Sequence, residues 1–106
     1  VEPKTVLKVG DLELNPQQHE VRRSGQPIEL TAREFTLLEF LLRRKETVVT
    51  RAMILDHVWD TDFEAEGGSN VVEVYINYLR RKVDAPFPRK LIHTVRGTGY
   101  ILQEKD

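Results

Sequence analysis

The sequence SNVVEVYINYLRRKVD (residues 69–84) has the apolar spacing of an amphipathic helix. At about 100° per residue, three apolar side chains fall within roughly 40° of Val72 and form with it a stripe that can pack against a core: Ile76, Leu79 and Val83. The opposite face carries three polar or basic residues and one valine: Asn70, Val74, Asn77 and Arg81. We therefore predict a helix over residues 69–84 with one face buried and the other exposed.

The exposed face of this predicted helix suits the major groove of DNA. Asparagine can pair with adenine, arginine with guanine, and valine can pack on a thymine methyl group. We predict base contacts from the four residues of this face. The flanks carry Tyr78, Arg80 and Lys82, which are placed for contacts with phosphates. A simple solvated helix face is the competing interpretation, and the helix alone does not decide between the two.

The next segment, LIHTVRGTGYIL (residues 91–102), has the pattern of a β-hairpin. Strand-like runs flank Gly97-Thr98-Gly99, whose glycines permit a tight turn. Arg96 is the only Lys, Arg, Asp or Glu in this segment, and we expect it at the hairpin tip. An arginine there can enter a narrow minor groove, where the potential is most negative. The alternative is a structural hairpin with a solvated arginine.

Upstream of residue 69 the pattern predicts strands followed by two helices. Residues 6–30 contain short alternating runs separated by turn signals at Gly10-Asp11 and Ser24-Gly25, which indicates a small antiparallel sheet. Thr31 and Glu34 have the spacing of a capping box at the start of the first helix. Thr50 is a candidate N-cap for the second helix. The apolar stripe of this second helix ends in Trp59, which we expect in the core. The predicted class is α+β: a helix-turn-helix with a wing.

Composition narrows the function further. The chain has 106 residues, enough for one domain, and it has no cysteine, so disulfides and cysteine-based zinc sites are excluded. Residues 1–68 carry a net charge of −4 and residues 69–106 one of +3. The basic part can face a polyanion, and an acidic loop can face another partner. Its acidic residues are Asp60, Asp62, Glu64 and Glu66.

Other functional classes find little support in the sequence. His19, His57 and His93 are scattered, so we expect no metal site, and no nucleophile has a base beside it in a catalytic motif. We expect no enzyme activity and no cofactor. No apolar run reaches the roughly 20 residues of a membrane span, and residues 1–5 do not look like a signal peptide. We expect a cytoplasmic protein without membrane association.

Four segments together resemble the effector domains of OmpR/PhoB-type bacterial response regulators. They are LTAREFTLLEFLL (30–42), VVTRAMILDHVW (48–59), and residues 69–84 and 91–102. They occur in the family's order and spacing, and the resemblance covers residues 6–103. It implies an N-terminal four-stranded antiparallel sheet, a three-helix core and a C-terminal β-hairpin wing. Residues 1–5 are then a linker remnant and residues 104–106 a C-terminal tail.

The resemblance also implies roles for individual residues. Helix 69–84 would read the major groove through Asn70, Val74 and Asn77. The positions implied to meet the DNA backbone or the minor groove are Tyr75, Tyr78, Arg80, Thr94 and Arg96. Asn77 and Tyr78 stand where many members carry arginine, so the resemblance does not carry over the base preference or the number of phosphate-binding charges of those members.

The partners implied by the resemblance are promoter DNA with direct-repeat sites, a second copy bound in tandem, and RNA polymerase. The polymerase contact would fall on the acidic loop between the second and third helices. A phosphorylated receiver domain and its sensor kinase would control the domain. The alternative is a winged-helix module that binds protein instead of DNA. Such a module needs an exposed apolar patch on helix 69–84, where only Val74 is available.

Overall fold

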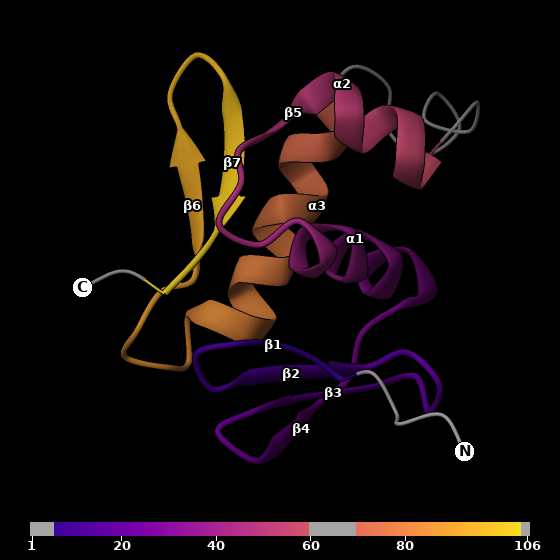
Figure 1. Ribbon diagram of the computed structural model, residues 1–106, viewed down its shortest axis with the longest axis vertical. Coiled ribbons are helices and arrows are strands. Elements are labelled where there is room, and N and C mark those ends of the chain that lie inside the picture. The colour runs from indigo at the N-terminus through magenta and orange to yellow at the C-terminus, as the bar shows by residue number, and fades with distance from the viewer. Residues whose placement is uncertain (1–5, 60–69, 105–106) are drawn as a thin grey trace.

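The N-terminal part of the chain forms a four-stranded antiparallel sheet (Figure 1). The strands are β1 (Leu7–Val9), β2 (Leu12–Asn15), β3 (Glu20–Arg23) and β4 (Gln26–Ile28), and they pair in sequence order. Ser24 and Gly25 both have positive φ, 54° and 77°, as a two-residue β-hairpin turn requires. The computed structural model describes residues 6–59 and 70–104. The linker remnant, the acidic loop, Ser69 and the end of the tail lie outside the described residues.

The first two predicted helices are present, and threonine caps both. In α1 (Ala32–Arg43), Thr31 Oγ1 accepts from Glu34 N, and the Glu34 carboxylate accepts from Thr31 N at 2.9 Å, so the capping box is confirmed. Thr50 Oγ1 accepts from Met53 N at 3.1 Å at the start of α2 (Arg51–Ile54). This second helix continues as a π-helical segment, η1 (Leu55–Trp59).

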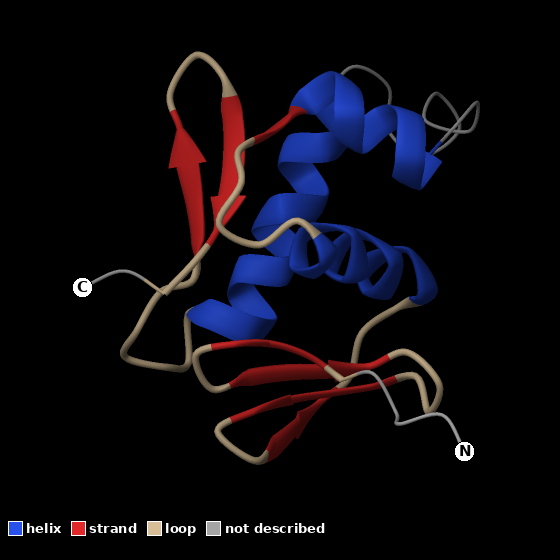
Figure 2. Cartoon of the chain, in the orientation of Figure 1, coloured by secondary structure: helices blue, strands red, loops and turns tan. Residues whose placement is uncertain are grey.

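The third predicted helix is also present. It comprises α3 (Val71–Leu79) and a π-helical continuation, η3 (Arg80–Asp84). The predicted apolar stripe is buried: Val72, Ile76, Leu79 and Val83 are at most 1% exposed. Trp59 is 1% exposed, as expected of a core residue. The N-terminal sheet lies across one end of the helices (Figure 2). The wing hairpin stands beside α3.

The wing hairpin consists of β6 (Ile92–Val95) and β7 (Gly99–Leu102). A two-residue strand, β5 (Val49–Thr50), pairs with β7, so the hairpin belongs to a three-stranded sheet of order β5-β7-β6. The sequence pattern did not predict β5, because two residues are too short to show an alternation. This strand ties the wing to the segment that leads directly into α2.

The expected role of Gly99 in the wing turn was wrong. Thr98 N donates to Val95 O at 2.9 Å, so the turn comprises residues 96–98, and Gly99 is already part of β7. A Cβ at Gly99 would lie 1.9 Å from the carbonyl oxygen of Val49, too close for any side chain. Glycine is needed at this position because β5 passes against it.

Candidate nucleic-acid interface

The four predicted base-contacting residues lie on the outward face of α3 and η3. Asn70, Asn77 and Arg81 are exposed, and Val74 is half-buried. Asn70 is the N-cap residue of α3, but its side chain makes no capping hydrogen bond, so its amide is not used by the helix. The face combines amide, guanidinium and methyl groups in one row, which are the groups that read base edges in a major groove.

An aromatic row occupies one flank of this face. The Tyr75 ring packs edge-on against Trp59 and against Tyr78, with both centroid distances 5.2 Å. Tyr75 is half-buried and helps to hold α3 on the η1 segment. Tyr78 is 37% exposed, and the Arg81 guanidinium lies 5.8 Å from its ring centroid. Sequence reasoning gave Tyr75 a role at the DNA backbone and missed this packing role.

Arg80 connects the helix to the wing on the other flank. Its Nη2 donates to Thr94 Oγ1 at 2.7 Å, and its Nε donates to Ile92 O at 3.4 Å. The guanidinium also lies 5.9 Å from the centroid of the Tyr100 ring. Two residues predicted to meet the DNA backbone, one on η3 and one on β6, are therefore brought together by a direct hydrogen bond.

Segment 80–96 contains six basic residues: Arg80, Arg81, Lys82, Arg89, Lys90 and Arg96. Three of them are engaged elsewhere. Lys82 Nζ donates to Glu34 Oε1 at 2.7 Å, which directs it toward the start of α1. Lys90 Nζ donates to the carbonyl oxygens of Asp84 and Phe87, and Arg89 pairs with Glu104 at 2.6 Å. The other three, Arg80, Arg81 and Arg96, lie on the surface formed by the third helix and the wing, which we call the helix–wing face.

The Lys82 ion pair and the capping box together affect Glu34. Burial alone would raise the pKa of this carboxyl group, but hydrogen bonds from Lys82 and Thr31 outweigh burial and lower the pKa below its ordinary 4.5. Glu34 therefore stays charged and links the start of α1 to the end of the third helix.

A second ion pair joins α2 to the first turn of α3. Arg51 Nε lies 3.0 Å from Glu73 Oε2. The Tyr100 hydroxyl lies close enough for the Glu73 charge to act on it: burial and then Glu73 raise the pKa of Tyr100, and Arg80 and Arg51 oppose them. Four interacting residues therefore lie on the side of the wing that faces the helix: Arg51, Glu73, Arg80 and Tyr100.

Arg23 forms a buried charged cluster that sequence reasoning missed. It is 0% exposed, donates to Asp11 Oδ1 at 2.5 Å and pairs with Asp84 at 3.3 Å. It also donates to the carbonyl oxygens of Val83 and Arg89, and it lies 4.8 Å from the Phe87 ring centroid. Arg23 and Val21 share the buried face of β3. The alternation of the strand therefore placed a basic residue on the buried face, and this was the signal that could have indicated a buried charge.

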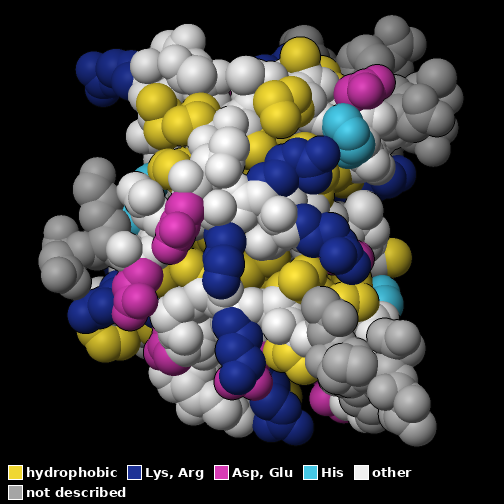
Figure 3. Space-filling model, viewed as in Figure 1, with side chains coloured by type: hydrophobic (Ala, Val, Ile, Leu, Met, Phe, Trp, Pro, Cys, Tyr) yellow, Lys and Arg dark blue, Asp and Glu magenta, His cyan; other side chains and the backbone are white. Residues whose placement is uncertain are grey.

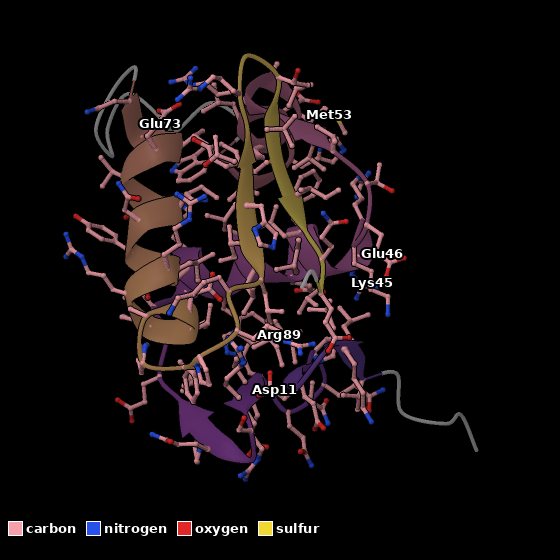
Figure 4. The ribbon with its side chains drawn as sticks, turned by 90° about the vertical axis from the view of Figure 1, so that its left-hand side faces the viewer. Asp11, Lys45, Glu46, Met53, Glu73 and Arg89 are labelled. Atoms are coloured by element: carbon pink, nitrogen blue, oxygen red, sulfur yellow. The ribbon has the colours of Figure 1, made fainter. Side chains whose placement is uncertain are left out.

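Asp84 completes this cluster from the end of η3. It is 3% exposed and accepts from the backbone N–H groups of Leu91 and Ile92 at 3.1 and 3.0 Å. Figure 4 shows Asp11 and Arg89 at the junction between the N-terminal sheet and the segment before the wing. The cluster fixes the end of the third helix and the start of β6 on the sheet.

A family model for "Transcriptional regulatory protein, C terminal" matches residues 25–102. The chain is 51% identical over 98 residues to the response regulator MprA of Mycolicibacterium vanbaalenii. The alignment covers 92% of this chain and 42% of the relative. The chain belongs to the OmpR/PhoB-type effector domains. This family consists of the DNA-binding domains of response regulators, so the fold prediction of a winged helix-turn-helix is confirmed.

Similar solved structures support the assignment of the chain to this family. One is response regulator DrrB, described as a Thermotoga maritima OmpR/PhoB homologue, which superimposes with a TM-score of 0.78 at 29% sequence identity. The superposition covers 92% of this effector domain and 44% of DrrB. The RstA DNA-binding domain of Klebsiella pneumoniae, solved in complex with the RstA box, gives 0.79 at 26% identity, covering 93% and 97%. The chain spans about two fifths of the length of the curated relatives that it matches.

Two observations concern other classes of site. Within residues 6–59 and 70–104, no group of three or more His, Cys, Asp or Glu side chains could hold a metal ion. In the same ranges, no helix has the length and apolar character needed to cross a membrane. The predicted contact loop for RNA polymerase, with Asp60, Asp62, Glu64 and Glu66, falls outside the described residues.

Proposed function

We propose that this effector domain binds double-stranded DNA in a sequence-specific manner and thereby regulates transcription. The outward face of α3 and η3 would enter the major groove, and Arg96 at the wing turn would approach the minor groove. The observation that carries the proposal is the row of Asn70, Val74, Asn77 and Arg81 beside a wing that Arg80 and Thr94 join to the same helix. Helix and wing can then contact one DNA duplex together.

The charge at the end of the wing supports this placement. Figure 3 views the molecule from the side of α1, so the outward face of α3 lies on its far side, but a basic side chain is seen to project at the end of the wing hairpin. Arg96 is the only Lys or Arg between Leu91 and Leu102. The RstA domain, which shares this fold, was solved in complex with its DNA box, and this also supports DNA as the ligand.

The structure modifies the proposed contacts to the DNA backbone. Arg80, Thr94 and Tyr78 remain candidates for phosphate contacts, because they border the outward face of the third helix. Tyr75 would act mainly through packing against Trp59, and Lys82 is committed to Glu34. Phosphate binding should therefore depend on fewer cations than the sequence suggested.

We further propose the partners that the family resemblance implies. Two copies would bind a direct-repeat promoter site in tandem, and a receiver domain with its sensor kinase would control that binding. RNA polymerase would contact the acidic loop of residues 60–66. The relatives' greater length, of which this chain spans about two fifths, is consistent with a further domain in the full-length regulator.

Selection of tight binders from a library of random duplexes tests the proposal, followed by footprinting on the enriched sequence. We expect one enriched motif, and we expect Asn77→Ala to relax the preference at single positions while binding to random DNA persists. A bidentate base contact is worth about 1–3 kcal/mol of discrimination. Failure to enrich any motif would contradict sequence-specific binding.

A protein-binding winged helix is the alternative function. Among the described residues, Tyr78 is the only large hydrophobic side chain that is exposed, at 37%. A protein-docking face on α3 would need a contiguous apolar patch. The structure therefore favours DNA over a protein partner for this face.

A further inference from the structure

The ion pair between Arg51 and Glu73 is incompletely bonded. The two side chains are 37% and 45% exposed, and one nitrogen–oxygen contact of 3.0 Å joins them. The second guanidinium nitrogen, Arg51 Nη2, and the second carboxylate oxygen, Glu73 Oε1, are buried and have no hydrogen-bond partner among the described residues. Ion pairs of this exposure contribute little to stability, and buried polar atoms without a partner are costly. Another acceptor for Arg51 could therefore compete with Glu73.

Arg51 lies beside the sheet that carries the wing, so it would be close to a DNA backbone in the proposed binding mode. It follows β5 directly, and β5 pairs with the wing strand β7. Glu73 and Arg80 are seven residues apart, about two helical turns, so they lie along the same side of the third helix. Arg80 on this side already contacts the wing through Thr94. Figure 4 shows Glu73 at the N-terminal end of α3.

Glu73 is the only acidic residue in Val71–Leu79 and in Leu91–Leu102. A carboxylate at this position repels phosphates, and it also neutralises the arginine that could bind one. A phosphate offers the same geometry of acceptor oxygens as a carboxylate, and guanidinium groups bind either with paired hydrogen bonds.

We propose that Arg51 is a phosphate-binding residue that Glu73 holds in the free domain, and that a DNA backbone phosphate replaces the Glu73 carboxylate on binding. Glu73 then acts as a competing internal anion that weakens binding to all sequences by a similar factor. The inference rests on the proposed function, because it requires a DNA backbone between the third helix and the wing.

A double-mutant cycle tests the exchange. Affinity for a mixed-sequence DNA duplex is measured at several salt concentrations for the wild type, Glu73→Gln, Arg51→Gln and the double variant. We expect Glu73→Gln to raise affinity about two- to fivefold at low salt, because an exposed ion pair of modest strength no longer competes. In the Arg51→Gln background, the gain should shrink to that of the control Glu39→Gln. Glu39 forms a comparable pair with Arg43 on α1 at 2.8 Å.

The salt dependence gives a second readout. Binding of one additional phosphate changes the slope of log K against log salt by about −0.9. Glu73→Gln should therefore have a steeper slope than the double variant by about that amount. An equal affinity gain from Glu73→Gln with and without Arg51 would overturn the inference, because the carboxylate would then act only through its charge at a distance.

Folding and the proposed function are checked separately. Thermal unfolding of each variant shows whether it is folded. If Arg51→Gln does not fold, Arg51→Lys replaces it. Lysine keeps the charge but cannot form the paired hydrogen bonds, so the affinity gain from Glu73→Gln should be only partly retained in this background. A full gain with lysine would overturn the proposed guanidinium–phosphate contact. If the folded wild type does not bind the duplex at any salt concentration, the proposed function fails and this inference fails with it.

Discussion

Arg80 Nη2 donates a hydrogen bond to Thr94 Oγ1 over 2.7 Å, which links the third helix to the wing strand β6. The two residues are fourteen positions apart in the chain, and no other side-chain to side-chain hydrogen bond between η3 and β6 is found among the described residues. Together with the bonds that join Arg80 and Asp84 to the backbone of Ile92, this bond holds the third helix and the wing in one relative orientation. The proposed simultaneous contact with both grooves of a duplex would depend on this orientation.

Thr94→Ala should weaken DNA binding more than it weakens the fold. Thr94 is exposed, so loss of its hydroxyl should change the free energy of unfolding by no more than about 0.5 kcal/mol. We expect a three- to tenfold loss of affinity, on the order of 1 kcal/mol, as for a typical hydrogen bond. Thr94→Ser keeps the oxygen and should bind like the wild type. Equal affinities for the alanine and serine variants would show that this bond does not matter for binding.

Arg96→Ala should weaken binding to sites flanked by A·T tracts by about 1–2 kcal/mol. Narrow A·T-rich minor grooves have the most negative potential and attract a guanidinium group. Arg96→Lys should recover only part of the loss, because an ammonium group is more strongly hydrated. The measurement is affinity before and after the flanking A·T tract is exchanged for G·C.

Arg22→Ala is the matched control for Arg96, since Arg22 is an exposed arginine near the hairpin turn of the N-terminal sheet. Arg22→Ala should leave the affinity for both duplexes, with the A·T or the G·C flanking tract, the same as that of the wild type. If the wild type and Arg96→Ala lose equal affinity on the exchange of the flanking tract, Arg96 does not contact the minor groove.

Arg23→Met should destabilise the fold strongly. The arginine is fully buried, and its removal would leave Asp84 buried without its charged partner. Breaking a buried ion pair by removing one member costs about 3–5 kcal/mol. Urea unfolding of Arg23→Met and of Arg22→Ala provides the comparison, and the surface variant should stay within about 0.5 kcal/mol of the wild type. A loss below about 1 kcal/mol for Arg23→Met would mean that the cluster contributes little.

Acid should destabilise the wild type partly through Glu34. Its pKa in the folded state lies below the ordinary 4.5, so its contribution to stability is complete above that value and is lost as the pH falls through the folded pKa. Glu34→Gln cannot titrate, so its stability should fall less steeply over this pH range. Thermal unfolding between pH 3 and pH 7 measures both, and parallel pH curves would contradict the lowered pKa.

The features that could be predicted from the sequence are local ones. The stripe of Val72, Ile76, Leu79 and Val83 follows from helical spacing within one segment, and the capping box of Thr31 and Glu34 needs only three residues of separation. The outward face of the third helix follows from the same spacing. Periodicity reports these features because neighbouring residues alone determine them.

The features that escaped prediction depend on distant parts of the chain. Lys82 was expected to face solvent or phosphate, but Glu34 is 48 residues away and pairs with it. Arg23 and Asp84 are 61 residues apart. The requirement for glycine at position 99 comes from Val49 on a different strand. Such contacts exist only after the sheet, the helices and the wing have assembled, so no local pattern specifies them.

The most direct test of the account is the salt dependence of binding to a mixed-sequence DNA duplex. Counting all six basic residues in segment 80–96 would give a slope of log K against log salt near −5, at about −0.9 for each phosphate neutralised. The structure leaves Arg80, Arg81 and Arg96 on the helix–wing face, and the proposed exchange at Arg51 would add a fourth phosphate contact, so we predict a slope of about −3 to −4. A slope near zero, or no binding at low salt by the folded domain, would contradict the conclusion that this surface binds DNA.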